Sequence, residues 1–331
     1  MLQENNRITY IDLAKGFCIV LVVLFHTKGV LNVHYSCDAF LASFRLPLYF
    51  FLSGLFFKDY GSFIRFIIKK VNRLLVPFFC FYLCFSVCVP NLLHNVLNIN
   101  FDTVVGWTSI WAFIHPGQYP NIPIWFLWCL FLMNVLFLII YKVSNRYGGQ
   151  FSISIVILFC VTCGFIGSQF INSEFTDYGN FFKALQNMPF FCFGYLLKHY
   201  GGLQCIQEMS RPSIIFFILI FLFLTFFLTI FYPVYFMTGV TGTLFILLLA
   251  RLIDRLPFFS YVGRYSIMLL LTHDLLIRAL TPLCVSLSEK TGSQTAIFLL
   301  FITVLMSYYL LIPLMQRFLP HVTAQKPLFR E

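Results

Sequence analysis

The sequence has little charge. Aspartate, glutamate, lysine and arginine together make up 10% of its 331 residues, whereas a soluble domain usually holds roughly 25%. Hydrophobic residues make up 60% of the chain, phenylalanine alone occurs 44 times, and the mean hydropathy is +0.87. These proportions exclude an ordinary soluble domain and indicate an integral membrane protein.

The chain also lacks a polar linker, an internal repeat and a low-complexity segment, so we expect a single membrane domain over residues 1–331. The first apolar run contains Asp12 and Lys15 and has no cleavage site of the A-x-A type. We therefore expect it to be a retained helix and not a cleavable signal peptide.

Ten apolar runs are long enough to cross a bilayer as helices, at about 20 residues each or somewhat fewer where a helix is tilted. Their continuity predicts an all-α, polytopic membrane protein with about ten transmembrane helices. The predicted spans cover residues 11–31, 44–58, 74–96, 122–142, 151–171, 182–198, 213–232, 234–250, 265–287 and 294–318.

The formal net charge of +10 comes from basic residues that crowd alternate connections between the spans. Residues 58–73 alone hold five of them. By the positive-inside rule this pattern places those connections, and with them both termini, in the cytoplasm. The same distribution argues against nucleic acid as a partner and for membrane lipid.

The 11 cysteines are an odd number and lie mostly inside apolar runs, where small apolar packing is their expected role. Cys160 and Cys163 form a C-x-x-C pair, but no second pair of ligands stands near them in the sequence. We therefore expect no metal site.

Residues 58–77, KDYGSFIRFIIKKVNRLLVP, have an amphipathic pattern in which Arg65, Lys69 and Arg73 recur at every fourth position. This pattern predicts a helix lying at the cytoplasmic membrane interface. Two roles stay open for the three cations. They can attract anionic lipid, or they can also bind the phosphates of a nucleotide-bearing cosubstrate.

All four tryptophans lie between residues 107 and 128, in and just after a predicted outer loop over 98–121. Such residues commonly form an interfacial belt. Aromatic planes also stack on sugar rings, so Trp125 is a candidate for carbohydrate binding.

The first span carries three ionisable side chains: Asp12, Lys15 and His26. Eleven residues of α-helix turn through about 1,100° and rise about 16 Å, so Lys15 and His26 share one face, and Asp12 joins them three positions earlier. Charged groups inside a span are costly and usually face a cavity or a partner. Lys15 can alternatively extend to the near interface, and His26 can be a structural hydrogen-bonding residue. A histidine can also accept and return a proton near neutral pH.

The stretch IDLAKGFCIVLVVLFH, residues 11–26, resembles the opening of the acyltransferase-3 family of multi-spanning membrane O-acyltransferases. In that family the first helix carries an arginine, ten further residues and then a histidine. The resemblance continues in order along the chain, through FRLPLYFFLSGLFFK (44–58), KKVNRLLVPFF (69–79), IPIWFLWCLFLMN (122–134), MPFFCFGYLLK (188–198) and VGRYSIMLLLTHDLLI (262–277).

The resemblance implies transfer of an acyl group, usually acetyl from cytoplasmic acetyl-CoA, to a hydroxyl of a glycan or other acceptor, in the inner membrane of a bacterium. By position, His26 matches the family's essential histidine, Lys15 its arginine and Asp12 the acidic residue before it. Lysine at this place is similar to the fucose 4-O-acetylase-like branch, but it lacks the planar fork of arginine. Arg45 stands where that branch often has a histidine, which leaves the acceptor of this chain open.

The hypothesis from the sequence is that His26 acts as general base, either directly or through an acetyl-histidine. Lys15 and Arg45 would stabilise the cosubstrate or the developing oxyanion. Arg264 is a candidate for a CoA phosphate, with ordinary positive-inside topology as the alternative, and His273 either lines the cavity or makes a structural hydrogen bond. Two other functions stay open: a transporter or flippase of a lipid-linked sugar or small anion, and a sensor that has lost the activity. The oligomeric state and the acyl chain are left undecided.

Overall fold

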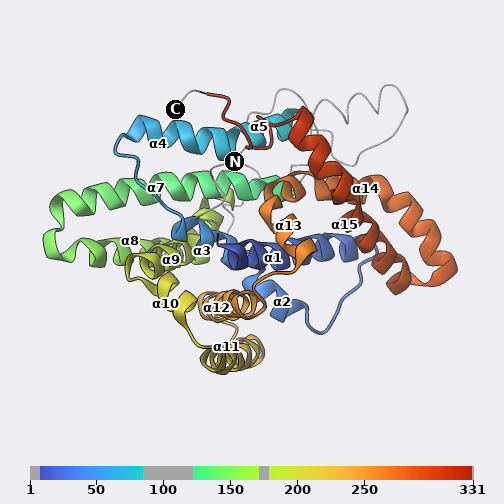
Figure 1. The fold of residues 1–331 in the computed structure, drawn as a ribbon, viewed down its shortest axis with the longest axis horizontal. Helices are drawn as coiled ribbons and strands as arrows, with labels where there is room; N and C mark the ends of the chain where they lie inside the picture. The colour runs from blue at the N-terminus through green and yellow to red at the C-terminus, as the bar shows by residue number, and fades with distance from the viewer. Residues whose placement is uncertain (1–7, 85–121, 171–178, 330–331) are drawn as a thin grey trace. The chain divides into compact units, whose positions relative to one another are not determined.

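The computed structural model describes residues 8–84, 122–170 and 179–329 (Figure 1). The described residues are helical and include no β-strand. They hold seven helices that are long and apolar enough to cross a membrane. These are α1 (Thr9–Gly29), α7 (Trp125–Tyr147), α8 (Ser152–Phe170), α11 (Arg211–Phe231), α12 (Tyr235–Ile253), α14 (Ser266–Thr291) and α15 (Ser293–Phe318).

All seven match predicted spans, so the all-α membrane architecture is confirmed for these runs. The predicted span at 182–198 forms α9 (Gly179–His199), a helix with Pro189 in its interior. The predicted span at 44–58 differs from the structure: two short helices, α2 (Asp38–Arg45) and α3 (Pro47–Leu55), are separated at Leu46. The break comes just before Pro47, which has no backbone N–H to donate to the preceding turn.

Another difference concerns the amphipathic segment. We expected an interfacial helix followed by a separate span from residue 74, but α4 (Phe63–Lys70) continues without a break through a π-helical turn, Val71–Leu75, into α5 (Val76–Phe81). Pro77 lacks a backbone N–H and would obstruct a regular helix. The wider turn just before it accommodates the proline. The rest of the predicted span and the loop over 98–121 lie largely or wholly outside the described residues.

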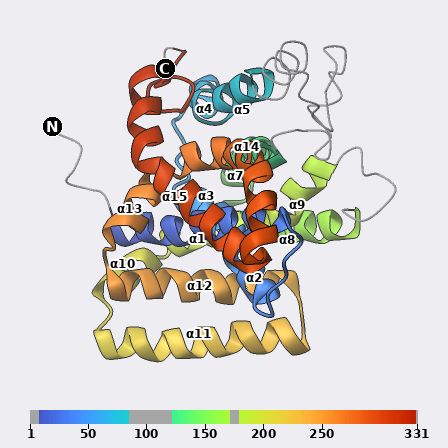
Figure 2. The ribbon, with the colours of Figure 1, turned by 90° about the vertical axis from the view of Figure 1, so that its right-hand side faces the viewer.

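The chain divides into two units. The first comprises residues 1–52 and 194–311, and the second comprises residues 53–193 and 312–331. In the first unit α1 is central: it packs against α2, α12, α14 and the short helix α13 (Pro257–Arg264). Helices α11 and α12 lie side by side in the same unit (Figure 2).

Helices α1 and α13 touch backbone to backbone. A Cβ atom built on Gly16 would lie 2.0 Å from the carbonyl oxygen of Phe259, and one built on Gly263 would lie 1.8 Å from the carbonyl oxygen of Asp12. Small residues allow this close approach, which is the usual way for helices to associate in a membrane. The contact fixes the N-terminal half of α1 against α13.

In the second unit, Gly54 of α3 makes a similar contact with α9, because its Cβ would lie 1.8 Å from the carbonyl oxygen of Phe191. The preceding Ser53 accepts a hydrogen bond from the Asn134 side chain at 3.2 Å. The Leu-Ser-Gly triplet therefore serves close helix packing. Near it, the buried ring of Phe57 contacts the rings of Phe66 and Phe137.

The C-terminal segment of the second unit is held by one side chain. Asn72, 2% exposed, accepts hydrogen bonds from the backbone N–H groups of Leu328 and Phe329 and donates one to the carbonyl of Phe329, at 2.8–3.0 Å. Because one amide satisfies three backbone groups, it fastens the last described residues to the π-helical turn.

Candidate active site

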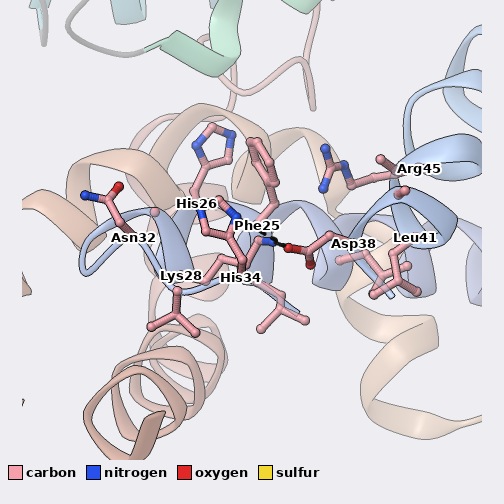
Figure 3. A pocket seen from close by; sticks show the side chains of 14 residues that line it. Phe25, His26, Lys28, Asn32, His34, Asp38, Leu41 and Arg45 are labelled. Atoms are coloured by element: carbon pink, nitrogen blue, oxygen red, sulfur yellow. Dashed lines mark ion pairs between the residues drawn. The ribbon is translucent and has the colours of Figure 1, made fainter. Parts of the chain in front are cut away.

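A cavity of about 450 Å³ lies at the C-terminal end of α1, within the first unit (Figure 3). Its walls come from the last turns of α1, the connection over residues 30–37, and α2. Six polar residues contribute to the lining: His26, Lys28, Asn32, His34, Asp38 and Arg45. Apolar side chains such as Phe25 and Leu41 supply much of the rest, so the cavity has the mixed character of a ligand site.

The connection over 30–37 is fastened at Asp38. This carboxylate forms an ion pair with Lys28, accepts a hydrogen bond from the backbone N–H of Tyr35 at 3.0 Å, and lies 4.0 Å from His34 Nδ1. Desolvation raises the pKa of the Asp38 carboxyl, but the hydrogen bonds from Lys28 and Tyr35 outweigh it and lower the pKa below its usual value. Lys28 and Asp38 both line the cavity, and their opposite charges neutralise each other.

His26 connects this cavity to α14. Its Nδ1 lies 4.0 Å from Oδ1 of Asp274, and its ring centre lies 5.1 Å from that of His273. The His26 side chain is 22% exposed and that of Asp274 is 8% exposed. The imidazole is therefore accessible from the cavity and backed by a buried carboxylate.

The carboxylate of Asp274 is itself oriented by Arg278, whose Nε donates to Asp274 Oδ2 at 3.0 Å. Reasoning from the sequence gave neither residue a role. The i,i+4 spacing of an aspartate and an arginine on one helix was the available signal. That Asp274 faces His26 depends on the packing of α14 against α1, which no local pattern encodes.

His273 is fully buried and makes the structural hydrogen bond that was one of its two expected roles, but it is not among the residues that line the cavity at His26. Its Nδ1 lies 2.7 Å from the carbonyl oxygen of Leu269, and because a carbonyl only accepts, Nδ1 carries the proton. Its Nε2 is thereby an acceptor, with no hydrogen-bond partner in the described part of the chain. The same ring contacts His26.

Arg45 ends α2 and lines the cavity. Its Cζ lies 4.1 Å from the centre of the Phe25 ring, in a cation–π contact. Phe25 also contacts the His26 ring, with the two centres 5.2 Å apart. The structure thus brings Arg45 and His26 to one cavity, with Phe25 in contact with both.

Asp12 and Lys15 lie toward the other end of α1. Their side chains form the expected pair, with 4.0 Å between Lys15 Nζ and Asp12 Oδ1. Lys15 is not among the residues that line the cavity at His26. Asp12 instead lines a second cavity of about 300 Å³, together with Thr9, Arg255, Ser260, Tyr261 and Arg264.

The other predicted residues belong to the second unit. Arg65 and Arg73 are exposed on the helix formed by α4 and the π-helical turn, and Lys69 Nζ lies 4.3 Å from the centre of the Tyr60 ring. Lys183 Nζ lies 4.5 Å from the ring centre of Trp125. Among the described residues, no three His, Cys, Asp or Glu side chains gather in a way that would hold a metal ion.

In a comparison with known protein families, a family described as an acyltransferase domain matches residues 8–312. No curated protein and no solved structure matches the chain. The match spans both units and includes α1 and α14, which carry His26 and Asp274.

Proposed function

The chain belongs to the acyltransferase-3 family, whose match covers nearly its whole length, and from this membership we propose which acyl transfer it performs. The protein is a membrane acyltransferase. In our proposal it moves acetyl from acetyl-CoA to a hydroxyl of a surface glycan or glycan precursor, with His26 as the general base.

The observation that carries this proposal is the pairing of His26 with Asp274 at the edge of a cavity. Asp274 lies toward Nδ1 of His26, which leaves Nε2 for the hydroxyl of the acceptor. The separation of 4.0 Å is longer than a hydrogen bond, and contacts of this kind commonly tighten only when substrate binds. Arg278 holds the carboxylate in place, and the negative charge of Asp274 would favour the imidazolium formed during the reaction.

The reaction then proceeds by a balanced transfer. His26 Nε2 removes the proton of the acceptor hydroxyl as the oxygen attacks the thioester carbonyl of acetyl-CoA. The new C–O bond forms, the C–S bond breaks, and the proton passes from His26 to the departing thiolate. Holding both substrates in one dry site contributes further acceleration.

The donor is proposed to approach from the opposite end of α1. Asp12 and His26 are 14 residues apart in the helix, a rise of about 21 Å, so an extended pantetheine arm suits the separation better than a compact donor. Arg255 and Arg264 line the second cavity and would meet the phosphates of CoA. Lys15, paired with Asp12, would bind the cosubstrate between the two ends or stabilise the developing oxyanion.

Arg65, Lys69 and Arg73 would contact anionic lipid or the same phosphates, and Trp125 a sugar ring of the acceptor. We further propose that the protein resides in a bacterial inner membrane with both termini in the cytoplasm. This orientation puts the second cavity, at the start of α1, on the side where acetyl-CoA is available.

The test is an assay of purified protein in nanodiscs with acetyl-CoA labelled in the acetyl group. Alkali-labile label should appear in glycan acceptors and not when free acetate replaces acetyl-CoA. Transfer to amines alone, or no transfer to any glycan in a panel of neutral and acidic sugars, would contradict the proposal.

A further inference from the structure

The guanidinium of Arg45 is a charge without an ion-pair partner among the described residues, and it lies in the wall of the cavity at His26. It is half-buried, stacks on Phe25 at 4.1 Å, and forms no ion pair and no hydrogen bond with any residue in the described ranges. A desolvated cation without a counter-charge is unfavourable. Stacking on a ring fixes the plane of the guanidinium but leaves its N–H groups without acceptors.

Asp38, the acid in the lining of the cavity, attracts Arg45 but forms no ion pair with it. Asp38 is engaged by Lys28, by the Tyr35 N–H and by His34. The remaining polar groups of the lining, Asn32 and the imidazoles, do not supply a negative charge at neutral pH. The lining as a whole is therefore left with the positive charge of Arg45.

The geometry relates this charge to the reaction site. The ring of Phe25 lies 4.1 Å from Arg45 Cζ and 5.2 Å from the ring centre of His26, and Figure 3 shows it drawn between the two groups. A ligand lying against Phe25 would reach both. One monosaccharide is long enough to place a hydroxyl at His26 and a substituent of a neighbouring carbon at Arg45.

We propose that the acceptor is an acidic sugar, whose carboxylate or phosphate binds Arg45 while its hydroxyl faces His26. This inference rests on the proposed acetyl transfer and specifies its acceptor. The planar fork of arginine matches a two-oxygen anion, and such charge-assisted pairs are about twice as strong as neutral hydrogen bonds. A carboxylate on the sugar ring and a phosphate linking the sugar to a lipid carrier share this chemistry.

The test measures binding and transfer separately. Calorimetry without acetyl-CoA compares glucose, glucuronic acid and glucose 6-phosphate as probes on the wild-type protein, on Arg45→Gln and on Arg45→Lys. Wild type should bind at least one acid about tenfold to a hundredfold more tightly than glucose. Arg45→Gln should lose that preference while its melting temperature stays near wild type, and Arg45→Lys should keep part of it. Tighter binding of glucuronic acid would indicate a carboxylate on the acceptor, and tighter binding of glucose 6-phosphate would indicate a phosphate.

The matched control is Arg317→Gln, which removes another arginine that stacks on a neighbouring phenylalanine, with Cζ 5.5 Å from the Phe318 ring centre, but on an exposed surface. It should bind the three probes as wild type does. The inference is overturned if both acids bind no better than glucose, or if Arg45→Gln weakens all three equally. If the protein does not transfer acetyl, the assay with labelled acetyl-CoA will show it. The calorimetry contains no acetyl-CoA, so its binding result can be interpreted independently.

Discussion

Asp274 is the residue that the proposed chemistry depends on most after His26, because in the proposal its carboxylate orients the imidazole and stabilises the imidazolium. Replacing it with asparagine keeps its size but removes its charge. We expect the kcat of Asp274→Asn to fall on the order of a hundredfold with KM nearly unchanged, since the orientation and charge stabilisation of the imidazolium are lost while binding is kept.

A merely structural role for Asp274 predicts a different result. In that case Asp274→Asn would lower the melting temperature and raise KM as well, and Asp274→Glu would be no better. If Asp274 positions His26, the glutamate variant should recover part of kcat, because a carboxylate returns to the same face of α14. Steady-state kinetics with thermal unfolding of the three proteins separates the two cases.

At the scale of elements, the contact between α1 and α13 depends on the absence of a side chain. The Cβ of Gly16→Ala would meet the Phe259 carbonyl at 2.0 Å, and backbone cannot move aside as a flexible side chain does. We expect a loss of about 1–3 kcal/mol of stability or more, measured as a lower melting temperature in detergent.

Gly29→Ala is the matched control in the same helix, because a Cβ at Gly29 has nothing within 4 Å. Alanine favours the helix there, so this variant should be as stable as wild type or slightly more stable. Equal melting temperatures for Gly16→Ala and Gly29→Ala would contradict the close packing of α1 and α13.

The second element-scale prediction concerns the C-terminal segment fastened by Asn72. Asn72→Ala leaves the Leu328 and Phe329 amides and the Phe329 carbonyl without their partner. Because both residues are exposed and water can replace the amide, the cost is about 0.5–1.5 kcal/mol for each lost hydrogen bond. Hydrogen exchange of residues 319–329 should therefore accelerate strongly. Asn145→Ala, an exposed asparagine of α7, should leave that exchange unchanged; equal exchange in both variants would refute the fastening.

At the scale of the whole molecule, the apolar runs predicted the seven long helices because length and hydropathy alone determine a span. The break at Leu46 was readable from Pro47, whereas the continuous path through the π-helical turn was not, since an amphipathic pattern does not show where a helix joins the next. At the site, the spacing of Asp12 and Lys15 predicted their contact. It did not predict that His26 and Arg45 line one cavity, or that Asp274 of α14 lies beside His26. Both arrangements depend on packing between segments that are distant in the sequence.

The length of α1 makes a prediction about topology. Thr9 Oγ1 donates to Asp254 Oδ1 at 3.1 Å at one end of this helix, and the connection containing His34 follows its other end. A helix of 21 residues rises about 32 Å, the thickness of a bilayer core. Single cysteines introduced as His34→Cys and Arg255→Cys in a cysteine-free background should therefore react with an impermeant maleimide from opposite sides. Labelling of both from one side would contradict a spanning α1.

The central claim is that His26 performs the proton transfer of an acyltransferase, and the direct measurement is the single-turnover rate of acetyl transfer by His26→Ala in nanodiscs. The rate should fall about 100-fold to 10,000-fold, while His199→Ala, which removes an exposed histidine of α9, should retain the wild-type rate. A His26→Ala protein that folds and transfers acetyl as fast as wild type would contradict the account.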